Sequence, residues 1–180
     1  MDKPVELIPL TCPRCSTPVP AESGEVAWVC SQCGEGWSLE AERGLAPLSV
    51  EFSAGIAPNT SGKPYWVVEG QVSLQRQSFG SNQQQSSEAE VFWRQPRRFL
   101  IPAYTCTLEE LLDLGTRMLL QPPALQPGSS ARFDPATLAP EDLQATAEFI
   151  VMAIEASRKD KLKQVDFNLR LSSPVLWVLP

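Results

Sequence analysis

Four of the five cysteines of this 180-residue chain form two pairs near the N-terminus, Cys12-x2-Cys15 and Cys30-x2-Cys33. Two intervening residues let the chain turn tightly, so both thiolates of a pair can face one metal ion at about 2.3 Å. Two such turns complete a tetrahedron, and this spacing is typical of zinc sites. Because four sulfur ligands leave no coordination position open, we expect the ion to stabilise the fold and to take no part in catalysis.

Zinc is the metal that thiolate ligands at this spacing favour. Iron is the alternative cofactor, because rubredoxins also bind one metal through two CxxC pairs. Those pairs usually carry glycine after the second cysteine, whereas Ser16 stands there in the first pair of this chain. Two disulfides would require an oxidising compartment, and a thioredoxin-like CxxC requires a βαβ setting; the sequence indicates neither.

The segment between the pairs, residues 18–29, is predicted to form a hairpin whose returning strand is residues 26–29. Gly34 follows Cys33, the second cysteine of the second pair, where a positive φ would let the loop close on the metal. Trp28 and Trp37 flank the second pair. We expect these two side chains to shield the sulfurs from water, and they are candidates for a binding surface.

Residues 8–42 resemble the zinc ribbon family through these two CxxC pairs. The resemblance implies that the four cysteines bind one structural zinc and that residues 1–44 form a ribbon domain. With "PYWVVEG", "RRFLIPAY" and a terminal "LWVLP", the chain is also similar to poorly characterised bacterial zinc ribbon proteins, from which no activity carries over. Ribbons serve in nucleic-acid machinery, in protein docking and as stabilising units, so the family does not decide the function.

Residues 45–180 are predicted to form an α+β domain, in which an antiparallel sheet has two helices packed on it. Thr107 and Glu110 form a capping-box pattern at the start of one helix, and the pattern of residues 140–163 predicts the other. Residues 78–88 are polar and are predicted to form a loop. The predicted strands are residues 48–52, 65–77, 89–93, 97–104, 165–171 and 174–180.

The composition narrows the range of functions. The chain has no histidine, which excludes Ser-His-Asp and Cys-His catalysis. Its formal net charge is −6, and four thiolates with one divalent zinc would add −4 + 2 = −2, giving −8. An acidic chain is poorly suited to nucleic acid, because such binding depends on Lys and Arg that displace counterions. Arg94, Arg97 and Arg98 lie beside aromatic residues, and this basic cluster keeps nucleic-acid binding as an alternative.

We therefore predict a non-enzymatic adaptor or scaffold that binds another protein, with an exposed tryptophan-rich strand edge as one means of docking. The alternatives are a nucleic-acid-binding accessory factor of transcription or replication and a rubredoxin-like electron carrier. The apolar runs, such as residues 174–180, are too short to span a membrane. The first ten residues do not have the pattern of a secretory signal, so the expected compartment is the cytoplasm.

Overall fold

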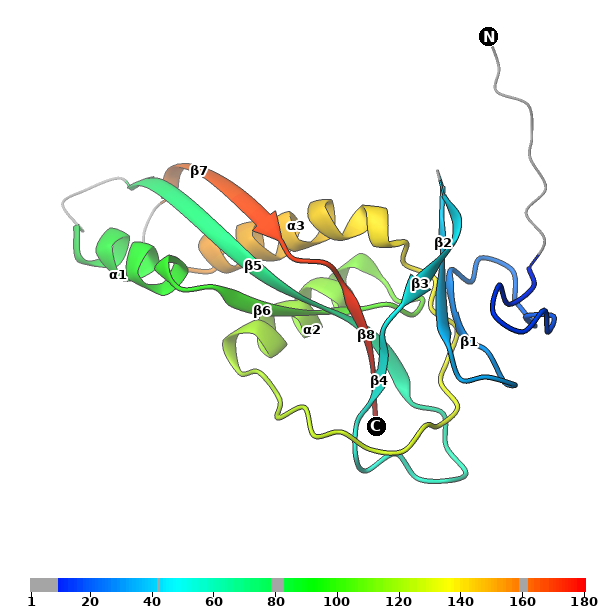
Figure 1. Cartoon of the computed structure of the whole chain (residues 1–180). Helices are drawn as coiled ribbons and strands as arrows, with labels where there is room; N and C mark the ends of the chain where they lie inside the picture. The colour runs from blue at the N-terminus through cyan, green and yellow to red at the C-terminus, as the bar shows by residue number, and fades with distance from the viewer. Residues whose placement is uncertain (1–9, 42, 79–82, 159–161) are drawn as a thin grey trace, which may run out of the picture.

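The computed structural model describes residues 10–41, 43–78, 83–158 and 162–180. The chain is α+β, as predicted, with a small sheet at one end and a larger sheet with helices beside it (Figure 1). The small, antiparallel sheet forms the N-terminal ribbon, with strands β1 (Ala27–Val29), β2 (Gly36–Glu40) and β3 (Gly44–Leu48) in that order. Because β3 pairs with β2, this sheet runs past the boundary predicted between residues 44 and 45.

The larger sheet contains strands β4 (Val50–Phe52), β5 (Lys63–Ser78), β6 (Arg97–Pro102), β7 (Leu162–Leu171) and β8 (Val175–Leu179). Its order is β4-β8-β5-β6, and β7 pairs with the part of β5 that lies beyond β8. The sheet is mixed, whereas the sequence predicts an antiparallel one, because β8 runs parallel to β4. Leu176 and Val178 of β8 are fully buried, and β8 lies between β4 and β5 in the sheet.

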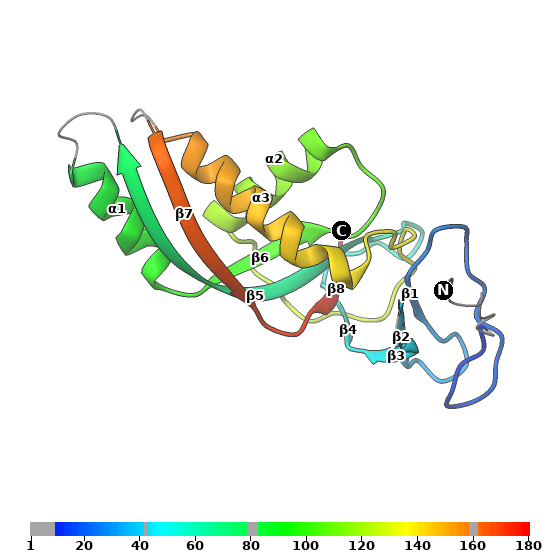
Figure 2. The same cartoon turned by 90° about the horizontal axis from the view of Figure 1, so that it is seen from above.

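The alternation of residues along β5 determines which face of the larger sheet is buried. Trp66, Val68 and Val72 point to the face that carries the main core. On the opposite face Glu69 and Gln71 are exposed, whereas Tyr65 is buried in a smaller cluster with Leu100 and Leu179. Three helices contribute to the core on the buried face, one more than the sequence predicts. They are α1 (Gln83–Arg94), α2 (Leu108–Leu120) and α3 (Leu143–Ala156), with a short 3-10 turn at Pro140–Asp142 before α3 (Figure 2).

Helix α2 begins where the sequence predicts. The Thr107 side chain accepts a hydrogen bond from Glu110 N at 3.2 Å, and the Glu110 carboxylate accepts one from Thr107 N at 2.9 Å. This capping box gives hydrogen-bond acceptors to backbone N–H groups that have none within the first turn of the helix. The hydrogen bond from the Thr107 backbone also lowers the pKa of the Glu110 carboxyl group. None of the described helices is both long and apolar enough to cross a membrane.

Helix α1 shows that two predictions are wrong. Residues 89–93 are helical rather than a strand, and residues 83–88 of the predicted loop belong to the same helix. Ala89 and Trp93 are buried one helical turn apart, while Val91 between them is 58% exposed, so the apolar pattern has the period of a helix. Residues 79–82 of the predicted loop lie outside the described residues.

Helix α3 ends earlier than the sequence predicts. It stops at Ala156 rather than near residue 163, and the Ser157 hydroxyl donates a hydrogen bond to Ile154 O at 2.8 Å. Leu162 already belongs to β7. The lysines of this region are good helix formers, but the pairing of β7 with β5 takes precedence over local propensity. Residues 159–161 lie outside the described part of the chain.

Residues 121–139, the connecting segment, join α2 to the 3-10 turn and tie the ribbon to the larger sheet. Val26 N in the ribbon donates to Ala136 O at 2.7 Å, and further backbone hydrogen bonds join the segment to the chain beside β4 and β5. Ala27 pairs with Ala136, and both are fully buried within the main core. The ribbon is therefore packed against the α+β part of the molecule.

Candidate metal centre

The four predicted cysteine ligands come together in the ribbon. Their sulfur atoms all lie within 4.8 Å of one another, with 3.6 Å between Cys12 and Cys33 and 3.5 Å between Cys15 and Cys30. A tetrahedral ion with metal–sulfur bonds of about 2.3 Å requires sulfur–sulfur distances near 3.8 Å. The four sulfurs therefore fit one tetrahedral ion, and all of these cysteines are free of disulfide bonds.

The two CxxC turns, here called the first and second knuckles, share one backbone geometry. Ser16 N donates to Cys12 O at 2.8 Å, and Gly34 N donates to Cys30 O at 2.9 Å. The residue after the second cysteine has a positive φ in both knuckles, 59° at Ser16 and 74° at Gly34. The prediction for Gly34 is thus confirmed, and Ser16 adopts a conformation that is costly for a residue with a Cβ atom.

The hairpins that carry the knuckles differ from the predicted one. Strand β1 pairs with β2 across the second knuckle, rather than with residues 18–20 across the space between the knuckles. The first knuckle has its own closure, where Val19 N donates to Leu10 O at 2.8 Å and Thr11 pairs with Pro18. Each knuckle is therefore the tip of a separate hairpin-like loop, and the two tips point their sulfurs at one centre.

The crowding of the four sulfurs favours a bound cation. The Thr17 hydroxyl lies 3.3 Å from Cys15 Sγ, and hydrogen bonds from the Thr17 side chain and backbone lower the pKa of Cys15 to about 6. Desolvation and the neighbouring sulfurs raise the pKa of Cys33 to about 12. Without a bound metal ion, four thiolates so close together would repel one another at neutral pH. A divalent metal supplies the charge that allows all four to ionise.

Trp28 and Trp37 lie opposite each other in the β1–β2 pair and close the ribbon core around the sulfurs. They are only 4% and 8% exposed, which agrees with their predicted shielding role and leaves little of either side chain as a surface. The predicted exposed tryptophan-rich strand edge is not found among the described residues. Trp66 is fully buried on β5, Trp93 is buried on α1, and Trp177 lies on the central strand β8.

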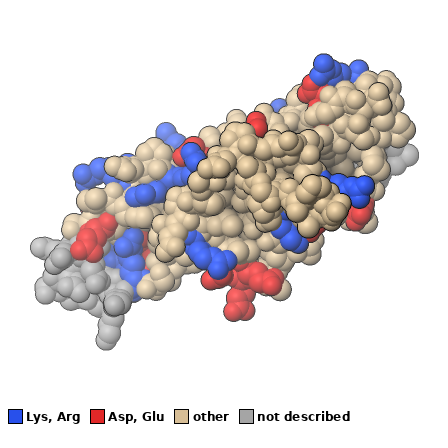
Figure 3. Space-filling model, turned by 90° about the horizontal axis from the view of Figure 1, so that it is seen from below, with Lys and Arg blue, Asp and Glu red and all other residues tan. Residues whose placement is uncertain are grey.

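The three predicted arginines do not form one open cluster. Arg97 donates to Phe92 O from two nitrogens at 2.9 and 2.6 Å, and its guanidinium lies 3.9 Å from the centre of the Phe92 ring. Arg98 forms an ion pair with Glu69 at 3.0 Å, and Arg94 is exposed at the end of α1. On the face shown in Figure 3 the basic side chains are scattered and several lie beside acidic ones.

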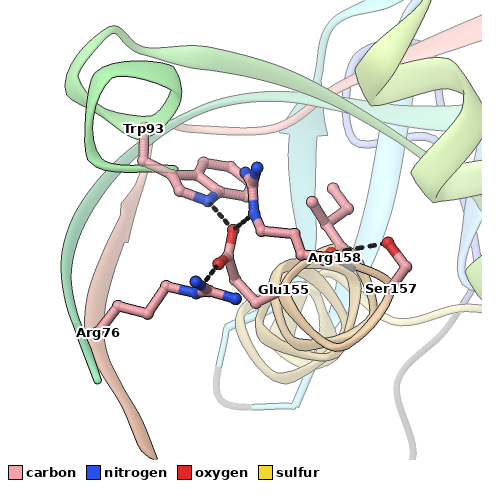
Figure 4. A network of polar contacts seen from close by, with 6 residues as sticks. Arg76, Trp93, Glu155, Ser157 and Arg158 are labelled. Atoms are coloured by element: carbon pink, nitrogen blue, oxygen red, sulfur yellow. Dashed lines mark hydrogen bonds and ion pairs between the residues drawn. The ribbon is translucent and has the colours of Figure 1, made fainter. Parts of the chain in front are cut away.

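Sequence reasoning missed a buried ionic network between β5, α1 and the C-terminal end of α3 (Figure 4). These elements meet at the end of the molecule away from the ribbon (Figure 1). The Glu155 carboxylate accepts hydrogen bonds from Trp93 Nε1 at 2.7 Å and Arg158 Nε at 2.8 Å. Its other oxygen lies 2.9 Å from Arg76 Nε, and the Arg76 and Glu155 side chains are fully buried. The sequence carries one signal for these two residues, which is the periodicity of buried positions in each element. Arg76 falls on the buried face of β5, and Glu155 follows the buried Val151 by one helical turn.

A hollow of about 750 Å³ opens beside the second knuckle. Trp28 and Ser31 of the ribbon line one side, Ser61 lies in the loop before β5, and Ser130 and Arg132 belong to the connecting segment. These parts are distant in the sequence, so only the fold brings them together. The lining is mixed, with hydroxyl groups and a guanidinium beside apolar surface.

Comparisons with protein-family models, with curated proteins and with solved structures find no match. The resemblance to zinc ribbons therefore rests on the cysteine spacing and on the clustered sulfurs. Together these establish a four-cysteine site that can hold a metal ion and is consistent with a zinc-binding knuckle motif.

Proposed function

We propose that the chain is a non-enzymatic adaptor with one structural zinc ion, and that it acts by binding another protein. The observation that carries the proposal is the closed set of four sulfur ligands, which leaves no position for a substrate or a reactive water. Zinc suits four thiolates in a tetrahedron and has no redox chemistry of its own. The site would then fix the shape of the ribbon instead of carrying out a reaction.

The hollow beside the second knuckle is the proposed docking site. Glu25 and Arg132 give its lining charges of both signs, and Ser31, Ser61 and Ser130 add hydroxyl groups. Such a lining matches the mixed donors and acceptors of an extended peptide better than the uniform negative charge of a nucleic-acid backbone. Because Cys30 also lines the hollow, loss of the metal would remove one of its walls.

Site-specific photo-crosslinking in cells tests this function. A photoreactive amino acid at Ser130 should capture a defined protein, and the same probe at Gln95, an exposed position between α1 and β6, should not. The Ser130 product should disappear when Cys33→Ser removes a metal ligand. Capture of nuclease-sensitive material at Ser130 would contradict the proposal in favour of nucleic acid, and a red iron-containing protein would contradict it in favour of electron transfer.

A further inference from the structure

The outer face of α3 carries an apolar stripe that the proposed metal centre and its hollow do not explain. Phe149 is 57% exposed and Met152 is 39% exposed, and exposed Ala145 and Ala156 extend the stripe by one turn at each end. These four positions lie within a narrow sector of the helix, opposite the buried Ala147, Ile150 and Ile154. In the view from above, α3 lies over the sheet and no other described element is drawn across it (Figure 2).

The spacing of this α3 stripe reads the same in both directions. It runs Ala145, four positions to Phe149, three to Met152 and four to Ala156. If a second copy of the helix lies antiparallel about a two-fold axis, each Ala145 faces the partner's Ala156 and each Phe149 faces the partner's Met152. Small residues at both ends let the helices approach, and the two large residues fill the centre. A parallel arrangement would instead set Phe149 against Phe149.

The charges along α3 also fit a second antiparallel copy. Between Leu143 and Ala156 the helix has only two charged residues, Glu148 and the buried Glu155. In the antiparallel register the position opposite Glu148 is Ala153, so no like charges meet. Arg158, which follows the end of the helix, is bound to Glu155 inside the molecule and takes no part in this pairing.

We propose that the α3 stripe is a self-association surface, which forms an antiparallel two-fold dimer of this chain. Two helices of four turns bury less than the roughly 1,200 Å² of a standard interface, so the dimer should be weak and reversible. Its dissociation constant should lie in the range of about 10 μM to 1 mM. The dimer would give an adaptor two docking hollows per assembly, although the pairing itself does not depend on the metal or on the proposed function.

Sedimentation velocity of the full chain at increasing concentration tests the proposal. The wild type should shift towards a dimer, and Phe149→Glu should weaken the dimer by roughly 30-fold, as expected for the loss of a central aromatic contact. Val91→Glu is the matched control, because Val91 is 58% exposed on α1 away from the stripe. This control should associate like the wild type, and circular dichroism should show all variants to be folded.

A charge-pair rescue tests the antiparallel register. Met152→Lys alone should weaken the dimer as Phe149→Glu does. The two substitutions in one chain should restore association at low salt, because each introduced carboxylate then faces the ammonium group introduced in the partner. A wild type that stays monomeric at about 1 mM would overturn the dimer. Equal effects of Val91→Glu and Phe149→Glu, or a double variant as weak as the single ones, would also overturn the proposed surface.

Discussion

Two buried polar clusters lie at opposite ends of this molecule, and they balance their charges in different ways. At the metal centre four ionisable thiols lie close together, and only an added cation can hold them all as thiolates. In the network of α3, the Glu155 carboxylate is matched by guanidinium groups of Arg76 and Arg158 from the chain itself. The first cluster should therefore depend on an external component, and the second should depend on three parts of the fold being in place.

The largest expected effect comes from breaking the metal centre. Cys30→Ser should abolish metal binding and unfold the ribbon, because structural zinc contributes about 10 to 16 kcal/mol to the folding of small zinc domains. Bound metal per chain and the fluorescence of the tryptophans report this loss. Cys106→Ser is the matched control, since Cys106 lies outside the cluster and this variant should keep one metal ion. Normal tryptophan fluorescence in metal-free Cys30→Ser would contradict the role of the ion.

The next largest effect comes from the ionic network. Glu155→Gln keeps the size of the side chain but leaves Arg76 buried without its counter-charge, and it should reduce the free energy of unfolding by about 3 to 5 kcal/mol. Urea unfolding measures the change. Glu148→Gln on the same helix is the control, because Glu148 contacts Gln144 at the surface and should change stability by less than about 0.5 kcal/mol.

Removing both charges sharpens this result. Arg76→Met combined with Glu155→Leu should be more stable than either single substitution, because neither charge is then left alone in the core. If the double variant loses as much stability as the two single changes added together, the network does not act as a charge pair.

A smaller effect should distinguish the tryptophans of the two clusters. Trp93 donates a hydrogen bond to Glu155, whereas the buried Trp37 Nε1 has no hydrogen-bond partner in the described structure. Trp93→Phe should therefore cost about 1 to 3 kcal/mol more than Trp37→Phe, which loses only packing. Thermal unfolding of both variants with metal bound gives the comparison, and equal losses would show that the Trp93 hydrogen bond contributes little.

The smallest expected effect is a gain of stability in the first knuckle. Ser16→Gly should remove the cost of a positive φ and stabilise the ribbon by about 1 kcal/mol, and Gly34→Ser should destabilise it by a similar amount. Competition with a chelator, followed through the fraction of metal retained, measures both changes. Equal retention by both variants and the wild type would mean that the positive φ is not costly here.

The same contrast explains what the sequence could and could not predict. The metal ligands could be predicted from the sequence because local spacing determines the geometry of each knuckle. The two spacings are Cys12 to Cys15 and Cys30 to Cys33. Arg76 and Glu155 are 79 positions apart, and their pairing depends on α3 packing over β5. The periodicity of the strand and of the helix indicates that each of these side chains points inward, but it does not identify the residue that each contacts.

The errors in the secondary structure have a similar origin. In the sequence, residues 89–93 look like a strand because five residues are too few to distinguish the two periods. The structure distinguishes them, because Val91 is exposed between the buried Ala89 and Trp93. The parallel pairing of β8 with β4 joins segments more than a hundred residues apart, and no local pattern indicates its direction. The capping box at Thr107 was predictable because both partners lie within one turn.

X-ray absorption at the metal edge of untagged protein tests the central claim most directly. We expect one zinc ion per chain with four sulfur neighbours at about 2.3 Å and no lighter ligand atom. A shell that contains oxygen or nitrogen would reveal an open coordination position, and a chain purified without stoichiometric metal would show that the four sulfurs are not a metal site. Either result would contradict a closed, structural metal centre.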